Sequence, residues 1–141
     1  MARLPDATDA PPVRRMSVAR GTLALSAATC ASLRGDGTEL LATARVAGTM
    51  AAKDAARAVP TALPVHLTDC FCDLSVEDGR VVCTTTVQAY ARTTLEAFAL
   101  AGTAGALLAL LDAAKSLEQD AEGNFPTARV TALEVVQNVI A

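Results

Sequence analysis

The sequence predicts an α+β fold of the ferredoxin-like type, with one antiparallel sheet packed by two long helices. Two runs rich in β-branched residues, 65–76 and 80–90, flank an Asp-Gly pair, which is a strong signal for a two-residue β-hairpin. Two further stretches, 39–58 and 95–119, have the spacing and apolar content of helices. With a strand near each end of the chain, this order gives the split βαβ arrangement.

The N-terminal third is expected to hold one strand and two helices. Residues 14–26 mix polar and apolar side chains as a half-buried strand does, and Gly21 is a candidate bulge position. A short helix, 27–33, should stop at the glycine-containing loop that follows it. In 39–58 six apolar positions fall on one helical face, and Pro60 ends this helix. These positions are Leu41, Ala44, Ala47, Ala51, Ala55 and Ala58.

The two-residue turn fixes the register of the hairpin. It sets Val76 opposite Val81 and Leu74 opposite Cys83. After the second long helix, a glycine and a proline break the chain, and residues 127–140 are expected to form the last strand.

The second long helix is predicted to begin with Thr94 as its N-cap and to be apolar on every face between residues 97 and 111. This uncharged run is shorter than the roughly 20 residues that a membrane span needs, so we expect a buried helix and no membrane. One sheet covers only one helical face, so the other faces need partners. We expect both the other long helix and a second copy of the chain, in a homo-oligomer between a dimer and a hexamer.

Length and composition favour a single cytoplasmic domain, 13–141, preceded by a flexible arm, 1–12. The 141 residues are 52% hydrophobic and only 3% aromatic, with a net charge of −3. Such a surface offers neither a basic patch nor stacking platforms, which argues against nucleic-acid binding. The arm has no apolar core of a signal peptide, and four cysteines without an export signal suggest reduced thiols.

The cysteines are expected to pack rather than to bind a metal. Under the hairpin register, Cys70, Cys72 and Cys83 project from one face. The single histidine, His66, lies about 13 Å from Cys70 along an extended strand, too far to complete a metal site. Buried free cysteines are usually small hydrophobic residues, so we predict no metal and no cofactor.

Asp112 and Lys115 lie three residues apart and share a helical face. A functional interpretation makes them an acid/base or binding pair, with partial burial lowering the pKa of Lys115. The alternative is a solvated ion pair near a helix C-terminus, where a cation is favoured in any case.

Two segments make the chain similar to the cyclic pyranopterin monophosphate synthase family. Residues 37–48, Gly-Thr-Glu-Leu-Leu-Ala-Thr-Ala-Arg-Val-Ala-Gly, resemble the family's Lys-Gly-Asp-Val-x-Ala-Thr-Ala-Arg-x-Ala-Gly. Glu96 resembles a glutamate of the family's Val-Glu-Met-Glu segment, and Asp112-x-x-Lys115 resembles the family's Asp-x-x-Lys at the same spacing from it. The resemblance runs over residues 13–129. It implies a ferredoxin-like fold, hexamers made of dimers, and sites at the dimer interface. It also implies conversion of a cyclised GTP-derived nucleotide into cyclic pyranopterin monophosphate with release of pyrophosphate, for the molybdenum cofactor.

Several family residues are absent. Gly37 stands where the family has a lysine, and Leu63 stands where it has a histidine. Phe98 replaces the second glutamate of the family's Val-Glu-Met-Glu segment. The family's basic tail has no counterpart after residue 129. The resemblance leaves as candidate catalytic residues Lys115, Asp112 and Glu96. The candidate substrate-binding residues are Arg45, one basic residue near the start (Arg15 or Arg14), Leu63 and Phe98.

Glu96 and Asp112 cannot meet within one chain if both lie on one helix. Sixteen residues at a rise of 1.5 Å separate them by about 24 Å. Either one of them lies outside the site, or the site combines two subunits, and the interface location that the resemblance implies fits the second case.

The losses lead us to expect a repurposed lyase or cyclase. A drier, less cationic pocket suits cyclisation, elimination or rearrangement of a small, less anionic molecule, as in natural-product biosynthesis. The first alternative is the family's own pterin synthesis. Another is a catalytically silent paralogue that assembles with an active partner, and a more remote one is a metal or redox protein that uses the cysteines.

Overall fold

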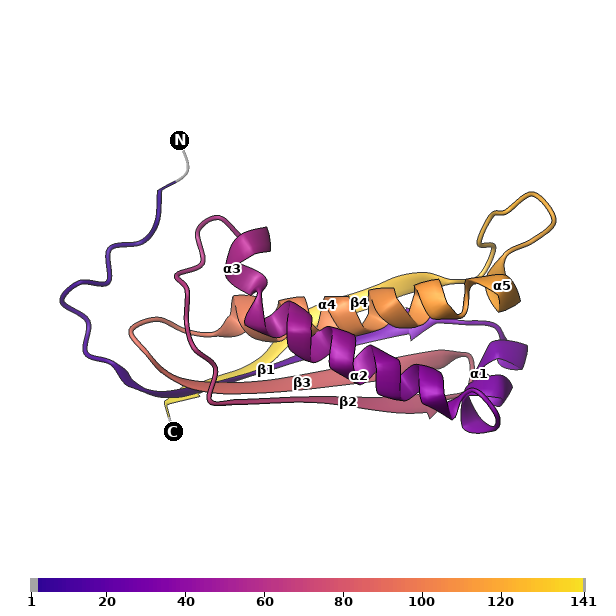
Figure 1. Cartoon of the computed structure of the whole chain (residues 1–141), viewed down its shortest axis with the longest axis horizontal. Coiled ribbons are helices and arrows are strands. Elements are labelled where there is room, and N and C mark those ends of the chain that lie inside the picture. The colour runs from indigo at the N-terminus through magenta and orange to yellow at the C-terminus, as the bar shows by residue number, and fades with distance from the viewer. Residues whose placement is uncertain (1–2, 141) are drawn as a thin grey trace.

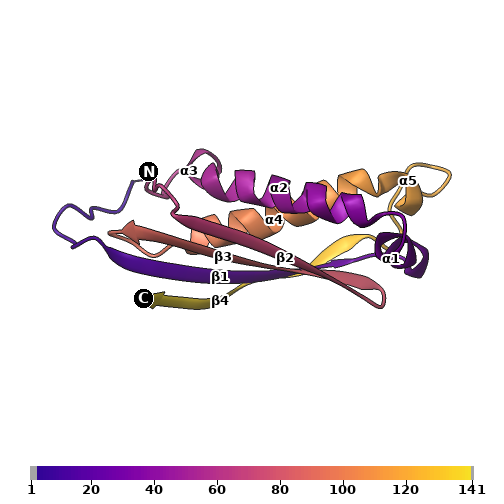
Figure 2. The same ribbon diagram turned by 60° about the horizontal axis from the view of Figure 1, so that its bottom comes forward.

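The computed structural model describes residues 3–140, which form one four-stranded antiparallel sheet with two long helices on one face (Figures 1 and 2). The strands are β1 (Val13–Ala24), β2 (Asp69–Glu77), β3 (Arg80–Ala91) and β4 (Arg129–Ile140). The long helices are α2 (Thr38–Lys53) and α4 (Glu96–Ala113), and the short ones are α1 (Ala27–Arg34), α3 (Ala55–Ala58) and α5 (Lys115–Glu118). The strand order β2-β3-β1-β4 confirms the predicted α+β, ferredoxin-like architecture.

The hairpin between β2 and β3 has the predicted register. Val76 pairs with Val81, and Leu74 pairs with Cys83. Gly79 in the turn has φ 74°, a left-handed conformation that strongly favours glycine. The Asp-Gly pair therefore specified both the turn and the register.

Gly21 is not a bulge, because it pairs regularly with Cys83 on β3 and with Leu133 on β4. A Cβ at this position would lie 2.8 Å from the Thr103 methyl carbon and 2.9 Å from a Leu107 methyl carbon of α4. Glycine is needed here because the helix lies directly on the strand. The register shifts occur elsewhere, in the pairing of β1 with β4.

Helices α2 and α4 lie side by side and approach closely where both have glycine (Figure 1). A Cβ on Gly48 would lie 2.9 Å from the Gly102 carbonyl oxygen, and a Cβ on Gly102 would lie 3.2 Å from the Gly48 carbonyl oxygen. The sheet and α2 thus cover two sides of α4, which explains much of its all-round apolar character. Although α4 is long and apolar enough to span a membrane, it is a core helix. Leu108 on its outer face is 67% exposed.

Three predicted boundaries were wrong. The helix predicted over 39–58 is interrupted at Asp54, whose N–H still bonds to the Met50 carbonyl before the chain turns into α3. The strand predicted from residue 65 begins at Asp69, because the ladder between β2 and β3 starts only where Asp69 pairs with Gln88.

Thr94 does not cap α4. Leu95 is the N-cap residue and makes no side-chain cap bond. Its carbonyl accepts the first backbone hydrogen bonds, from the N–H groups of Phe98 and Ala99.

A buried carboxylate holds α5 against the start of α1. Glu118 is only 6% exposed, and it accepts hydrogen bonds from the Ser26 N–H and hydroxyl and from the Thr29 hydroxyl. Ser26 also caps α1 by accepting from the Thr29 N–H. This network fixes the end of the molecule where α4 passes into α5.

Candidate functional site

The Asp112–Lys115 pair lies where α4 passes into α5. The Lys115 ammonium is 3.4 Å from the Asp112 carboxylate, and the two side chains are 55% and 75% exposed. Within one chain this is a solvated ion pair, and the partial burial of Lys115 that the acid/base interpretation requires is not present.

Glu96 lies at the other end of α4, as its first residue. One carboxylate oxygen, Oε2, is buried and has no hydrogen-bond partner among the described residues. Glu96 lines a hollow of about 340 Å³ together with Leu63 and Phe98. The structure therefore brings these three sequence-derived residues together, and it leaves a buried acceptor without the partner that such groups normally have.

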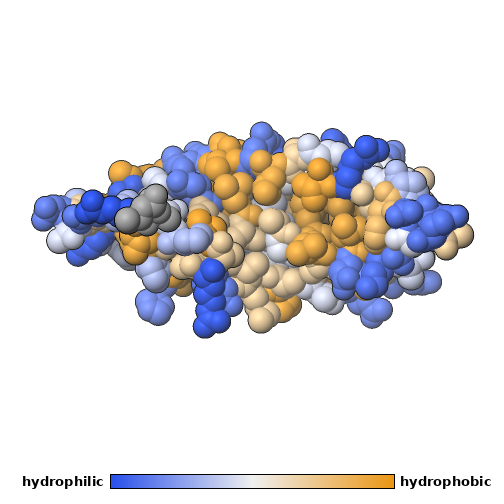
Figure 3. All heavy atoms as spheres, turned by 90° about the horizontal axis from the view of Figure 1, so that it is seen from above, coloured by the Kyte–Doolittle hydropathy of each residue, from blue (hydrophilic) through white to orange (hydrophobic). Residues whose placement is uncertain are grey.

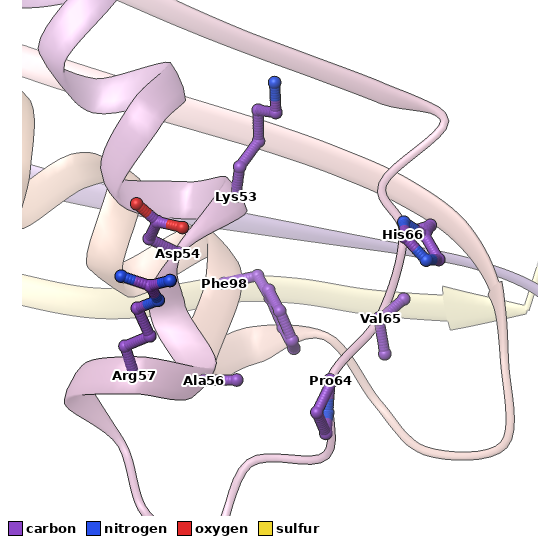
Figure 4. A pocket seen from close by; sticks show the side chains of 8 residues that line it. All are labelled: Lys53, Asp54, Ala56, Arg57, Pro64, Val65, His66 and Phe98. Carbon is purple, nitrogen blue, oxygen red and sulfur yellow. The ribbon is translucent and has the colours of Figure 1, made fainter.

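A second hollow, of about 420 Å³, also has Phe98 in its lining (Figure 4). Phe98 stands between the corner joining α2 and α3, which provides Lys53, Asp54 and Arg57, and the loop that carries His66. Within residues 3–140, neither Lys53 nor Arg57 takes part in an ion pair. We call Lys53, Arg57 and His66 the cationic corner.

Sequence reasoning did not predict the cationic corner. The available signal was weak: Lys53 and Arg57 are four residues apart at the end of a helix, and His66 follows in a proline-containing loop. Because the loop was expected to be a strand, its approach to the helix end could not be anticipated.

The arginines proposed from sequence lie in different places. Arg15 is near the Glu96 end, where its Nε donates to the Ala91 carbonyl at 3.2 Å and its side chain lines a hollow with Thr94. Arg14 points to the opposite sheet face and bonds the Gln88 side chain. Arg45 lies halfway along α2, away from both ends of α4. Of Arg14 and Arg15, Arg15 is therefore the residue on the sheet face that the helices cover.

The cysteines pack under α2. The Cys72 and Cys83 sulfurs lie 3.5 and 3.8 Å from the Thr85 hydroxyl, and no group of three metal-binding side chains occurs among the described residues. Burial raises the pKa of Cys83 to about 11. A hydrogen bond to Cys72, together with burial, raises the pKa of Cys70, while the same bond lowers the pKa of Cys72.

The model of the MoaC family matches residues 4–138 of this sequence. The chain belongs to the MoaC family. It is 38% identical to the probable cyclic pyranopterin monophosphate synthase of Methanospirillum hungatei, with 98% of this chain and 90% of that protein covered. It is 34% identical to the protein of the same name from Aeropyrum pernix, over 95% and 94% of the two chains. A probable cyclic pyranopterin monophosphate synthase accessory protein of Methanothermobacter thermautotrophicus is 30% identical, over 96% and 87%.

This MoaC-family chain has glycine at position 37, where the family resemblance places a lysine. Gly37 is the N-cap of α2, and a Cβ there would lie 2.9 Å from the Ser32 carbonyl oxygen. A side chain therefore requires the preceding turn to shift. Replacing Gly37 with lysine would therefore require a backbone adjustment as well as a longer side chain.

Proposed function

We propose that this chain acts in the synthesis of cyclic pyranopterin monophosphate for the molybdenum cofactor, as a lyase-type subunit of a cytoplasmic homo-oligomer. The names of its relatives favour this function over a role in natural-product biosynthesis, which neither the structure nor the relatives support. Its substrate would be a small phosphorylated molecule.

One structural observation carries the proposal: two hollows meet at Phe98. The cationic corner lines one of them, and the half-buried Glu96, whose Oε2 is buried, lines the other. Lys53 and Arg57, which take part in no ion pair within residues 3–140, suit a phosphate-bearing end, and a half-buried carboxylate suits hydrogen bonding or proton transfer at the ring end.

Lys115 and Asp112 would complete this site from a second subunit. They lie at the opposite end of α4 from Glu96, so one chain cannot bring them to the same substrate. A neighbouring copy would cover the exposed ion pair and place it beside the substrate as an acid/base group.

The experiment is a direct assay with the cyclised nucleotide substrate, following pyrophosphate release and cyclic pyranopterin monophosphate. The purified protein should form product, and Glu96→Gln should lose about 10²-fold or more in rate, the scale of an acid/base group. Glu122→Gln, which changes an exposed loop carboxylate, is the matched control and should remain active. No product from the purified wild-type chain would exclude autonomous catalysis.

A second candidate is an accessory subunit that requires an active partner. Gly37, Leu63 and Phe98 replace three side chains that the family's chemistry uses, and one relative's name includes "accessory protein". This candidate predicts no product from the chain alone and a gain in product when it is co-assembled with an active family member.

A further inference from the structure

The end of the molecule opposite Glu96 carries a buried carboxylate that has no part in the function proposed above. Glu118 accepts hydrogen bonds from the Ser26 N–H at 3.1 Å, from the Ser26 hydroxyl at 2.7 Å and from the Thr29 hydroxyl. Among residues 3–140 it takes part in no ion pair. Burial of a carboxylate is costly unless the group is paired or hydrogen-bonded, so these bonds replace the water that Glu118 would otherwise bind.

Glu118 is also the attachment point of the short helix that carries Lys115. It is the only buried residue of α5, whereas Lys115, Ser116 and Leu117 are exposed. A single helical turn is unstable in water by itself, so α5 needs support from the rest of the molecule. Figures 1 and 2 show α5 beside α1, and the Glu118 carboxylate bonds to residues at the start of α1.

The turn of α5 holds the backbone of Lys115 from both sides. Ala114, which precedes Lys115, is buried and continues from α4. The Lys115 carbonyl accepts a hydrogen bond from the Gln119 N–H at 2.8 Å, directly after Glu118. The Asp112 carboxylate belongs to α4 and the Lys115 ammonium to α5, so their 3.4 Å approach depends on how the two helices are set against each other.

We propose that Glu118 is a positioning residue for Lys115. By accepting hydrogen bonds from Ser26 and Thr29, its carboxylate orders α5 and sets the direction in which the Lys115 ammonium points. The role of Lys115 toward substrate rests on the function proposed above, whereas the attachment of α5 rests on the hydrogen bonds of Glu118.

Hydrogen exchange measured by NMR tests the attachment without any substrate. Glu118→Leu keeps a side chain of similar size and removes the acceptor oxygens. Exchange of the Gln119 N–H should accelerate about tenfold or more, the scale of losing a hydrogen bond to a charged group. Exchange of the N–H groups of α2 should not change. An unchanged exchange rate at Gln119 would overturn the inference.

A substitution on the other partner helix checks the same bond. Thr29→Val keeps the shape of the side chain and removes one donor to the Glu118 carboxylate. It should accelerate exchange at Gln119 by less than Glu118→Leu does, because the two bonds from Ser26 remain.

Rate measurements separate a positioning role from a merely structural one. Glu118→Leu should lower kcat about 10²-fold with little change in KM, the scale of a displacement of about 1 Å at a reacting group. Glu118→Gln keeps a carbonyl oxygen that can accept from Ser26, so it should retain most of kcat. Cys83→Ala, a substitution in the core of β3, is the control, and it should lower stability while keeping the wild-type kcat.

Mixing variant chains shows which half of a shared site contains Glu118. A dimer of Glu118→Leu with Glu96→Gln has one site made only of wild-type residues. Its mixtures should regain about a quarter of wild-type activity, because half of the dimers are mixed and each has one intact site of two. Glu118→Leu mixed with Lys115→Ala should regain none, because both changes affect the same half. Equal recovery in the two mixtures would contradict an action through Lys115.

The measurements also separate this inference from the proposed function. If exchange at Gln119 accelerates in Glu118→Leu but the wild type forms no product, Glu118 still anchors α5 and the proposed function fails. If the wild type forms product and Glu118→Leu has the same kcat, the positioning role of Glu118 is wrong and the proposed function stands.

Discussion

Lys115 forms an exposed i,i+3 ion pair with Asp112, a geometry that contributes little to folding stability. Lys115→Ala should therefore change the free energy of unfolding by less than about 0.5 kcal/mol, as measured by urea denaturation. If a second subunit encloses the pair, the same substitution should lower the rate about 10²-fold or more. Lys115→Arg should also be impaired, because arginine keeps the charge but cannot reach the neutral form.

The pair between Glu77 and Arg80 provides the control. It has the same i,i+3 spacing, and Arg80 is about as exposed as Lys115, but the pair lies beside the hairpin turn. Arg80→Ala should resemble Lys115→Ala in stability and the wild type in rate. An Lys115→Ala enzyme as fast as the wild type would leave Lys115 as a solvated surface residue.

Cys83 should make stability depend on alkaline pH. Burial raises its pKa from the model-compound value of 9.0 to about 11, so the folded state retains a proton that the unfolded state has lost. Its stabilising contribution is complete below the unfolded pKa and is lost as pH rises through the folded pKa. As the pH rises from 9 to 11, the free energy of unfolding of the wild type should fall by about 1–2 kcal/mol more than that of Cys83→Ala. Parallel denaturation curves from neutral to alkaline pH measure this difference, and equal losses in both proteins would contradict it.

At the level of elements, the contact between α2 and α4 depends on Gly102. A Cβ there would lie 2.9 Å from the Thr85 methyl carbon and 3.1 Å from the Ala52 Cβ. Gly102→Val should cost about 1–3 kcal/mol, the usual cost of overpacking, as measured by chemical denaturation. Ala104→Val places the same side chain at an exposed position of the same helix and should cost less than about 0.7 kcal/mol. Similar costs for both variants would show that the close approach does not limit packing.

The sequence predicted regular elements well and the segments between them poorly. Hydrophobic period and the Asp-Gly turn are local signals, so the strand order, the two long helices and the hairpin register could be inferred. The boundary at Asp69 could not, because the β-branched residues before it resemble a strand and only two prolines indicate a loop. The cationic corner depends on this loop, so it was missed together with it.

The candidate site was predictable only in part for a related reason. Leu63, Glu96 and Phe98 were proposed from the resemblance, and the structure brings them around one hollow. Lys115, Asp112 and Arg45 came from the same source, but one chain does not bring them there. The spacing along α4 predicted that Glu96 and Asp112 lie far apart within one chain. No sequence pattern predicts which surface of a second copy would bring the two residues together.

At the scale of the whole molecule, one side remains uncovered and apolar. Figure 3 shows apolar side chains gathered along the middle of the side formed by α4 and β4, between hydrophilic ends. The large exposed residues of these elements include Leu108 on α4 and Val130, Leu133 and Val135 on β4. β4 is also an edge strand, so its outer backbone groups have no strand partner in the described chain.

We therefore expect at least a dimer at micromolar concentration in sedimentation experiments. Leu133→Lys should weaken the assembly, because it places a charge on this side. Phe71→Lys, at an exposed position of β2 on the opposite edge of the sheet, should have a smaller effect. A stable wild-type monomer would contradict both the assembly and a site shared between chains.

Mixing two inactive proteins tests the shared site. If each site takes Glu96 from one chain and Lys115 from another, a mixed dimer of Glu96→Gln and Lys115→Ala contains one intact site. Random reassembly should then restore about a quarter of wild-type activity, because half of the dimers are mixed and each has one of two sites. No recovery, with exchange verified by mass spectrometry, would place the site within one subunit.

The pairing of β1 with β4 has a practical consequence for handling the protein. Arg15 near the start of β1 pairs with Ile140 at the end of β4, and both line the hollow beside Thr94. An affinity tag or fusion partner attached after β4 would therefore emerge next to the candidate site. The turn at Asp78 and Gly79 lies at the far end of the molecule, and an epitope inserted there would leave that entrance free.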